Sequence, residues 1–141
     1  MLQRMVIENI VKILEDDRMK HKTRQRQAII QCLGNADGPM SPQEVQAEAE
    51  KLVAGLGIAT VYRNLKMLAS SGKVRELVFP GEGSRYELAG LDHHHHFFCR
   101  DCDRVFCIEG CPGGFNAMIP KGFALEEHEI VLYGKCDECQ R

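Results

Sequence analysis

Apolar positions in the first part of the chain recur with the spacing of helices. Residues 5–15 carry apolar side chains at positions 6, 7, 10, 11, 13 and 14, which predicts an amphipathic helix. Thr23 precedes a second helical run, which ends at Gly34-Asn35 and has one apolar face formed by Ala28, Ile29, Cys32 and Leu33. We therefore expect two helices before residue 36, with Cys32 in the core.

Two further helices are predicted after the turn at Asp37-Gly38-Pro39. The segment Ser41-Pro42-Gln43-Glu44 predicts a helix start, because the Ser41 hydroxyl can accept from the backbone N–H of Glu44 while the Glu44 side chain reaches back to the cap. Val45, Ala49 and Leu52 continue this helix as far as Gly55 and Gly57. The last helix is predicted over residues 59–71, with a buried stripe formed by Val61, Leu65 and Leu68.

A β-hairpin is predicted after the helices, with strands at 74–79 and 84–88 and a turn at 80–83. Helices followed by such a hairpin are typical of a winged helix-turn-helix, in which the last helix enters the major groove of double-stranded DNA. Candidate DNA contacts are the exposed groups on the 59–71 helix and an earlier basic cluster: Thr60, Tyr62, Arg63, Lys66, Lys20, Lys22, Arg24 and Arg26. The alternative is a small helical domain with an ordinary polar surface.

The second part of the chain is dominated by cysteine and histidine. Two Cys-x-x-Cys pairs, Cys99/Cys102 and Cys136/Cys139, supply four thiolates that can complete a tetrahedron around Zn²⁺. The alternative is a pair of redox-active dithiols. Between the pairs we expect a strand at 104–108, a helix at 112–118 and a strand at 123–133.

Four consecutive histidines, His93–His96, lead into Cys99 and are predicted to enter a strand. Side chains alternate between the two faces of a strand, so His94 and His96 would share one face, and His93 and His95 the other. Further side chains of metal-ligand type remain after the four structural cysteines are assigned: Glu87, Cys107, Cys111 and His128. This pattern predicts metal binding beyond the structural zinc.

The composition and charge of the chain argue against a membrane-spanning or secreted protein. Six of the seven cysteines in the 141 residues lie after residue 98. The net charge of −2 hides an asymmetry, because residues 1–80 carry 12 Lys+Arg against 9 Asp+Glu, whereas residues 81–141 carry 6 against 11. No apolar run approaches the roughly 20 residues of a membrane span. Because no charged n-region followed by an apolar h-region opens the sequence, we expect no secretory signal. A cytoplasmic location is expected, where reduced cysteines favour metal over disulfides.

Signatures of enzymes are absent from the sequence. It contains no His-Glu-x-x-His zinc-protease motif, no deaminase His-x-Glu, no glycine-rich phosphate loop and no serine nucleophile elbow. A zinc enzyme would also need an open coordination position and a positioned general base. We therefore expect a binding protein without catalytic residues.

Several segments together resemble the ferric uptake regulator (Fur) family of bacterial metal-dependent repressors, including its zinc-uptake and peroxide-sensing branches. The motifs extend over residues 23–139: Thr23-Arg24-Gln25-Arg26, Ala59-Thr60-Val61-Tyr62-Arg63-Asn64-Leu65, Arg85-Tyr86-Glu87-Leu88, the run His93–Cys102 and Leu132-Tyr133-Gly134-Lys135-Cys136.

The resemblance implies an α+β protein with a winged-helix DNA-binding domain at 1–88 and a small α/β dimerisation domain at 89–141. It implies a homodimer that binds palindromic operators when loaded with metal. It further implies a structural zinc on the four paired cysteines and two other metal sites. The regulatory site falls on Glu87, His94, His96 and the position of Cys107, and an outer site falls on His93, His95 and His128, where Cys111 could complete it.

Two departures from the family pattern affect the expected site. The histidine that the family often supplies from the turn before the third helix is replaced by Pro39, with Met40 beside it. Cys107 stands where the iron and peroxide branches carry Glu or Asp, and a mixed set with one thiolate suits tetrahedral Zn²⁺ better than oxygen-rich Fe²⁺. We therefore expect a zinc-responsive repressor. The alternatives are another divalent metal, Fe²⁺ or Mn²⁺, and an oxidant sensed by Cys107 and Cys111.

Overall fold

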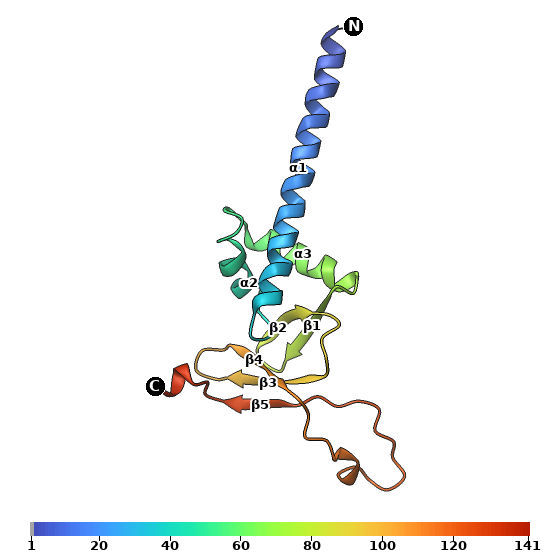
Figure 1. Ribbon diagram of the computed structural model, residues 1–141, viewed down its shortest axis with the longest axis vertical. Coiled ribbons are helices and arrows are strands. Elements are labelled where there is room, and N and C mark those ends of the chain that lie inside the picture. The colour runs from blue at the N-terminus through green and yellow to red at the C-terminus, as the bar shows by residue number, and fades with distance from the viewer. Residues whose placement is uncertain (1) are drawn as a thin grey trace.

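The computed structural model describes residues 2–141, and of residues 2–17 only the backbone. Three helices come first, α1 (Leu2–Asn35), α2 (Pro42–Ala49) and α3 (Ile58–Ser70). Two small sheets follow, and α1 extends far out of the remaining body, with the N-terminus at its distal end (Figure 1). Among the described residues, none of the helices combines the length and the apolar composition that crossing a membrane requires.

The first two predicted helices form one continuous helix of 34 residues, so the predicted break between them was wrong. The reason lies in residues 16–22, which contain neither Gly nor Pro and therefore give the backbone no cause to leave the helix. The predicted apolar face at positions 6–14 lies outside the described side chains. Further along α1, Ala28, Ile29, Cys32 and Leu33 are buried as expected.

Helix α2 begins as the sequence predicts. Ser41 is its N-cap, the backbone N–H of Glu44 donates to Ser41 Oγ, and the Ser41 N–H donates to the Glu44 carboxylate. The helix ends at Ala49, however, and Leu52 is 51% exposed instead of continuing the buried face. Helix α3 matches the prediction, since its Val61, Leu65 and Leu68 are buried against α1 and α2.

The predicted hairpin is present as β1 (Val74–Phe79) and β2 (Gly83–Leu88), paired antiparallel from Val74 opposite Leu88 to Phe79 opposite Gly83. The chain segment before α2 is added to this hairpin, because Met40 forms an isolated antiparallel bridge with Tyr86. The three helices and the hairpin share one core, in which Tyr86 packs with residues of all three helices. This is the arrangement expected of a winged helix.

The second sheet has the strand order β4-β3-β5, with β3 (His94–Cys99) in the centre. Strand β4 (Val105–Glu109) pairs antiparallel with β3, which agrees with the strand predicted at 104–108. Strand β5 (Val131–Gly134) pairs parallel with β3. A cluster of Leu77, Phe79, Phe98 and Val105 packs the hairpin against this sheet.

The connection between β4 and β5 differs from the prediction. The helix expected at 112–118 is reduced to the three-residue 3₁₀ helix η1 (Phe115–Ala117), and the strand expected at 123–133 is reduced to β5. The connection contains Pro112-Gly113-Gly114 shortly after β4, in which both glycines have positive φ, and almost all of its side chains are exposed. Several of its large apolar side chains, Met118 and Phe123 among them, are exposed, so neither element gains the packing that stabilises a short helix or strand. A second 3₁₀ turn, η2 (Glu138–Gln140), ends the fold.

Candidate metal centres and nucleic-acid interface

Three groups of metal-ligand side chains are assembled in the structure, and within each group the ligand atoms lie within 4.8 Å of one another. We call them the tetracysteine cluster (Cys99, Cys102, Cys136 and Cys139), the inner cluster (Glu87, His94, His96 and Cys107) and the outer cluster (His93, His95, Cys111 and His128). All twelve side chains that the sequence offered for metal binding are thus brought into the expected groups.

The tetracysteine cluster is built at one end of the second sheet. Cys99 ends β3 and lies opposite Gly134 of the parallel strand β5, so Cys136 follows at the same end. The turn after Cys99 returns through Asp103, the one described non-glycine residue with positive φ, and brings Cys102 to 3.9 Å from the Cys136 sulfur. Four sulfurs at this spacing fit one tetrahedral Zn²⁺.

Backbone amides favour the thiolate form at this cluster. The Cys136 N–H donates to the Cys99 Sγ at 3.3 Å. This contact and further backbone N–H groups outweigh burial and lower the pKa of the Cys99 thiol to about 6. Hydrogen bonding with Cys136 has the opposite effect on Cys139 and raises its pKa. The Cys99 sulfur is thus favoured as a thiolate, whereas Cys139 stays protonated until a bound cation displaces the proton.

The inner cluster joins the two sheets. Glu87 belongs to β2, whereas His94 and His96 belong to β3 and Cys107 to β4. The Nε2 atoms of His94 and His96 lie 3.0 and 3.3 Å from the same Glu87 oxygen, Oε2. Because a carboxylate only accepts, each of these contacts requires a proton or a metal ion between the two atoms.

Each group of the inner cluster is prepared by its surroundings. His94 Nδ1 donates to the carbonyl of Asp92 at 2.7 Å, which leaves Nε2 to face Glu87. Burial disfavours the charged carboxylate of Glu87, but hydrogen bonds from His96 and His94 outweigh it and lower its pKa. Burial likewise opposes charge on His94, yet Asp92 and Glu87 raise its pKa overall. Burial raises the pKa of the Cys107 thiol, and the nearby Glu87 carboxylate adds to the effect.

This donor set fits a divalent cation. Glu87 and His96 are buried and Cys107 is half-buried, so a carboxylate and a thiolate here need a compensating positive charge. One Zn²⁺ held by a carboxylate, a thiolate and two neutral imidazoles forms a neutral unit, so it satisfies this need with four ligands. The single protein oxygen and the sulfur are a poor match for Mg²⁺, Ca²⁺ or Mn²⁺, which favour oxygen ligands.

The outer cluster lies on the other face of the histidine run. His128 Nε2 is 3.1 Å from His93 Nε2 and 3.2 Å from Cys111 Sγ. His95 is buried, its Nδ1 accepts from the backbone N–H of Ile130 at 3.3 Å, and its Nε2 has no hydrogen-bond partner within the described structure. Cys111 and His128 come from the exposed connection between β4 and β5, so this cluster is more open than the inner one.

The candidate DNA contacts lie on α3 and α1. Tyr62, Arg63 and Lys66 are exposed on α3, and Arg63 donates to the Thr60 hydroxyl at 3.1 Å. Tyr62 is held by the amide of Gln43 at 3.2 Å. On α1, Lys22 and Arg24 are exposed, while Arg26 leans on Met67 of α3. Basic side chains are thus exposed on both helices, and the contact of Arg26 with Met67 links α1 to α3.

Sequence reasoning missed three residues that hold the clusters in place. Arg75 of β1 lies 3.6 Å from Glu87 Oε1 and 2.6 Å from Glu129, beside His128. Arg85 of β2 is buried, pairs with Glu44 at 2.8 Å and donates to the carbonyl of Asp103. The carbonyl of Asp37 accepts from the Cys107 N–H at 2.8 Å. Arg75 and Arg85 were visible in the sequence as basic residues within predicted strands, but their partners were not. Glu87 lies 12 residues from Arg75 in the same hairpin, and all the other partners are 18 or more residues away.

Comparison with known proteins places this arrangement among metal-dependent regulators. The model of the Ferric uptake regulator family matches residues 8–133. The Ferric uptake regulation protein of Campylobacter jejuni is 34% identical over 139 residues, which cover 95% of this chain and 88% of that protein. The Peroxide operon regulator of Bacillus subtilis is 30% identical over 123 residues, which cover 84% and 83%.

A solved structure shows the same likeness. The ferric uptake regulator of Helicobacter pylori, described as having three functional metal binding sites, has 27% sequence identity and a TM-score of 0.67. The match covers 92% of this chain and 93% of that one.

Proposed function

This chain belongs to the ferric uptake regulator family, and we propose that it is a zinc-responsive repressor that binds palindromic DNA as a homodimer. Members of this family are metal-responsive transcription regulators and not enzymes. What we propose is the identity of the effector metal, the side chains that bind it and the residues that contact DNA. It assigns the predicted DNA-binding domain to residues 1–88 and the predicted dimerisation domain to residues 89–141.

One observation carries the zinc assignment, the composition of the inner cluster. Its four ligand atoms are one oxygen, two nitrogens and one sulfur, which suit four-coordinate Zn²⁺. The tetracysteine cluster would hold a structural Zn²⁺, and the outer cluster a further ion with three nitrogens and one sulfur. Three candidate sites are also consistent with the description of the H. pylori relative.

The inner cluster would connect metal to DNA because its ligands come from both sheets. Glu87 lies on the hairpin that packs with the three helices, whereas the other three ligands lie on the second sheet. Sharing one Zn²⁺ would hold these two parts in one orientation. Such an orientation would set the spacing of the two α3 helices in a dimer, with Tyr62 and Arg63 near the bases and Lys22, Arg24 and Arg26 near phosphates.

Oxidant sensing by a Cys107–Cys111 disulfide is less well supported. Cys107 faces the inner cluster and Cys111 the outer cluster, on opposite faces of the β3 histidine run. Joining their sulfurs would require both clusters to come apart. The Cys107 thiol also has a raised pKa, which lowers the fraction of the reactive thiolate.

The experiment is operator binding at buffered free concentrations of Zn²⁺, Fe²⁺ and Mn²⁺. We expect Zn²⁺ to support binding at the lowest free concentration. Cys107→Ser should raise the required zinc concentration by at least about tenfold, whereas the matched variant Cys111→Ser should leave it nearly unchanged. Binding supported by Fe²⁺ alone, or a Cys107–Cys111 disulfide formed under mild peroxide with loss of binding, would replace zinc as the signal.

A further inference from the structure

The segment Asp37–Met40 between α1 and α2 is tied to both sheets, and we call it the strap. At one end, Met40 exchanges two backbone hydrogen bonds with Tyr86 of β2, at 2.9 and 2.8 Å. At the other end, the Asp37 carbonyl accepts from the Cys107 N–H of β4 at 2.8 Å. The strap therefore lies on the free edge of β4 and reaches the hairpin, with main-chain hydrogen bonding at each end.

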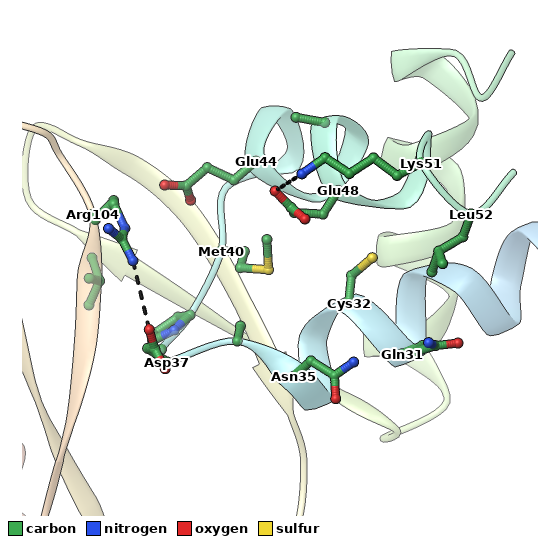
Figure 2. A pocket seen from close by; sticks show the side chains of 15 residues that line it. Gln31, Cys32, Asn35, Asp37, Met40, Glu44, Glu48, Lys51, Leu52 and Arg104 are labelled. Carbon is green, nitrogen blue, oxygen red and sulfur yellow. Dashed lines mark hydrogen bonds and ion pairs between the residues drawn. The ribbon is translucent and has the colours of Figure 1, made fainter. Parts of the chain in front are cut away.

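The fit of the strap against β4 depends on Gly38. A Cβ atom added at Gly38 would lie 2.1 Å from the carbonyl oxygen of Val105 and 2.8 Å from the Cα of Phe106. Both atoms belong to the backbone of a paired strand, so neither can move without displacing β4. Pro39, the next residue, is fully buried, and Asp37 forms an ion pair with Arg104 at 3.7 Å, as seen beside a cavity of about 510 Å³ (Figure 2).

The two ends of the strap lie next to ligands of the inner cluster. Tyr86 precedes Glu87 in β2, and the other end is bonded to Cys107 itself. Glu87 and Cys107 belong to different sheets, so no strand pairing sets the distance between them. Near Glu87 and Cys107, the strap connects β2 to β4 through main-chain hydrogen bonds. A second link is made by Arg85 of β2, whose side chain donates to the Asp103 carbonyl.

We propose that Gly38 is a positioning residue for the regulatory metal: by allowing the strap to dock on β4, it holds Cys107 opposite Glu87 before metal is bound. This inference rests on the proposed role of the inner cluster. The strap leads directly into Ser41, the N-cap of α2, so its docking also connects the metal ligands to the helices that would face DNA.

The test compares Gly38→Ala with Gly34→Ala in the full chain carrying its tetracysteine zinc. Gly34 is a matched control, because a Cβ there meets only Leu88 Cδ1, at an ordinary 3.5 Å. We expect Gly38→Ala to weaken zinc binding at the inner cluster by about 10- to 100-fold, the effect typical of groups that support metal ligands. Gly34→Ala should bind like wild type, and all three proteins should retain one zinc that resists chelation.

Two readouts separate positioning from general damage. The Co²⁺-substituted inner site should lose thiolate-to-metal absorption in Gly38→Ala, and by NMR the Cys107 amide should exchange faster with solvent. Unchanged inner-site affinity in a folded Gly38→Ala variant would overturn the proposal. If that variant does not fold, the hydrogen-exchange rate of the Cys107 amide in metal-free wild type tests the proposal instead. Slow exchange supports a strap that is docked before metal binds, and exchange as fast as in an open loop overturns the proposal.

Failure of the strap can be distinguished from failure of the proposed function. If wild type binds no exchangeable zinc, or if Cys107→Ser binds it as tightly as wild type, the inner cluster is not the regulatory site and both inferences are wrong. If Cys107→Ser weakens zinc binding and Gly38→Ala does not, only the role of the strap is wrong.

Discussion

The tetracysteine and inner clusters contain the same number of candidate ligands but are assembled in different ways. The four cysteines sit at one end of a single sheet, where the parallel pairing of β3 with β5 brings both Cys-x-x-Cys turns together. The inner cluster takes Glu87 from one sheet and its other ligands from another. A site within one sheet stabilises local structure, whereas a site between two sheets can report on their relative position.

Removing one tetracysteine ligand should have the largest effect. Cys136→Ser is expected to lose the structural zinc, and its second sheet should no longer show a cooperative unfolding transition. The reason is that structural zinc sites in small domains contribute about 10 kcal/mol or more to folding. Metal content per chain and a thermal melt measure this. Cys111→Ser serves as the control. A Cys136→Ser protein that kept both its zinc and its melting temperature would abolish the contrast between the two clusters.

Removing one inner ligand should impair metal binding but leave the fold intact. Glu87→Gln keeps the shape of the side chain and removes its charge, so we expect zinc affinity at the inner cluster to fall by about tenfold or more. The tetracysteine zinc should remain, as metal analysis after mild chelation would show. Loss of both metals together would mean that the two clusters are not independent.

The pH dependence of stability should distinguish the clusters more subtly. With the inner cluster free of metal, the raised pKa of His94 means that its contribution to stability is complete below the ordinary histidine pKa. That contribution is lost as pH rises through the higher pKa of the folded state. Between pH 6 and 8, urea unfolding should therefore contain a declining contribution from His94 in wild type. This is set against an opposite contribution from His95, whose pKa is lowered by burial and by the neighbouring histidines in wild type and the Glu87→Gln variant alike.

The Glu87→Gln variant should show a smaller His94 contribution, because the Asp92 carbonyl still raises the His94 pKa but the Glu87 carboxylate no longer does. The lowered pKa of Glu87 changes stability with pH in the opposite direction. Its contribution to the free energy of unfolding is lost only as pH falls through the low pKa of the folded state. It therefore adds no slope between pH 6 and 8. An equal slope in both proteins would contradict the assignment of this effect to the Glu87–His94 pair.

Local patterns predicted the elements that are stabilised by nearby residues. The Ser41 cap, the buried stripe of α3 and both hairpin strands follow from signals within a few residues. Alternation along β3 separated His94 and His96 from His93 and His95, whereas the assignment of Glu87, Cys107 and His128 to these two groups came from the resemblance to the family. Whether these groups bind metal in the predicted roles stays a prediction.

The sequence failed where long-range packing decides. The break predicted within α1 is an exception, because there the local signal itself, the absence of Gly and Pro from residues 16–22, favours one continuous helix. Leu52 fits the helical spacing of α2 but finds no surface to cover. The docking of Gly38 could not be predicted either, because its partners Val105 and Phe106 are far away in the chain.

The long connection between β4 and β5 has an evolutionary consequence. Strands β4 and β5 flank β3 on either side, so residues 110–130 leave the sheet after Glu109, opposite His94, and return across β3 at the same end, at Val131 opposite His96. This crossover is exposed and largely irregular, and lengthening such a segment costs little free energy. Insertions or deletions there would separate Cys111 from His128 while leaving the four cysteines in register. The outer site could thus be gained or lost among descendants without endangering the fold.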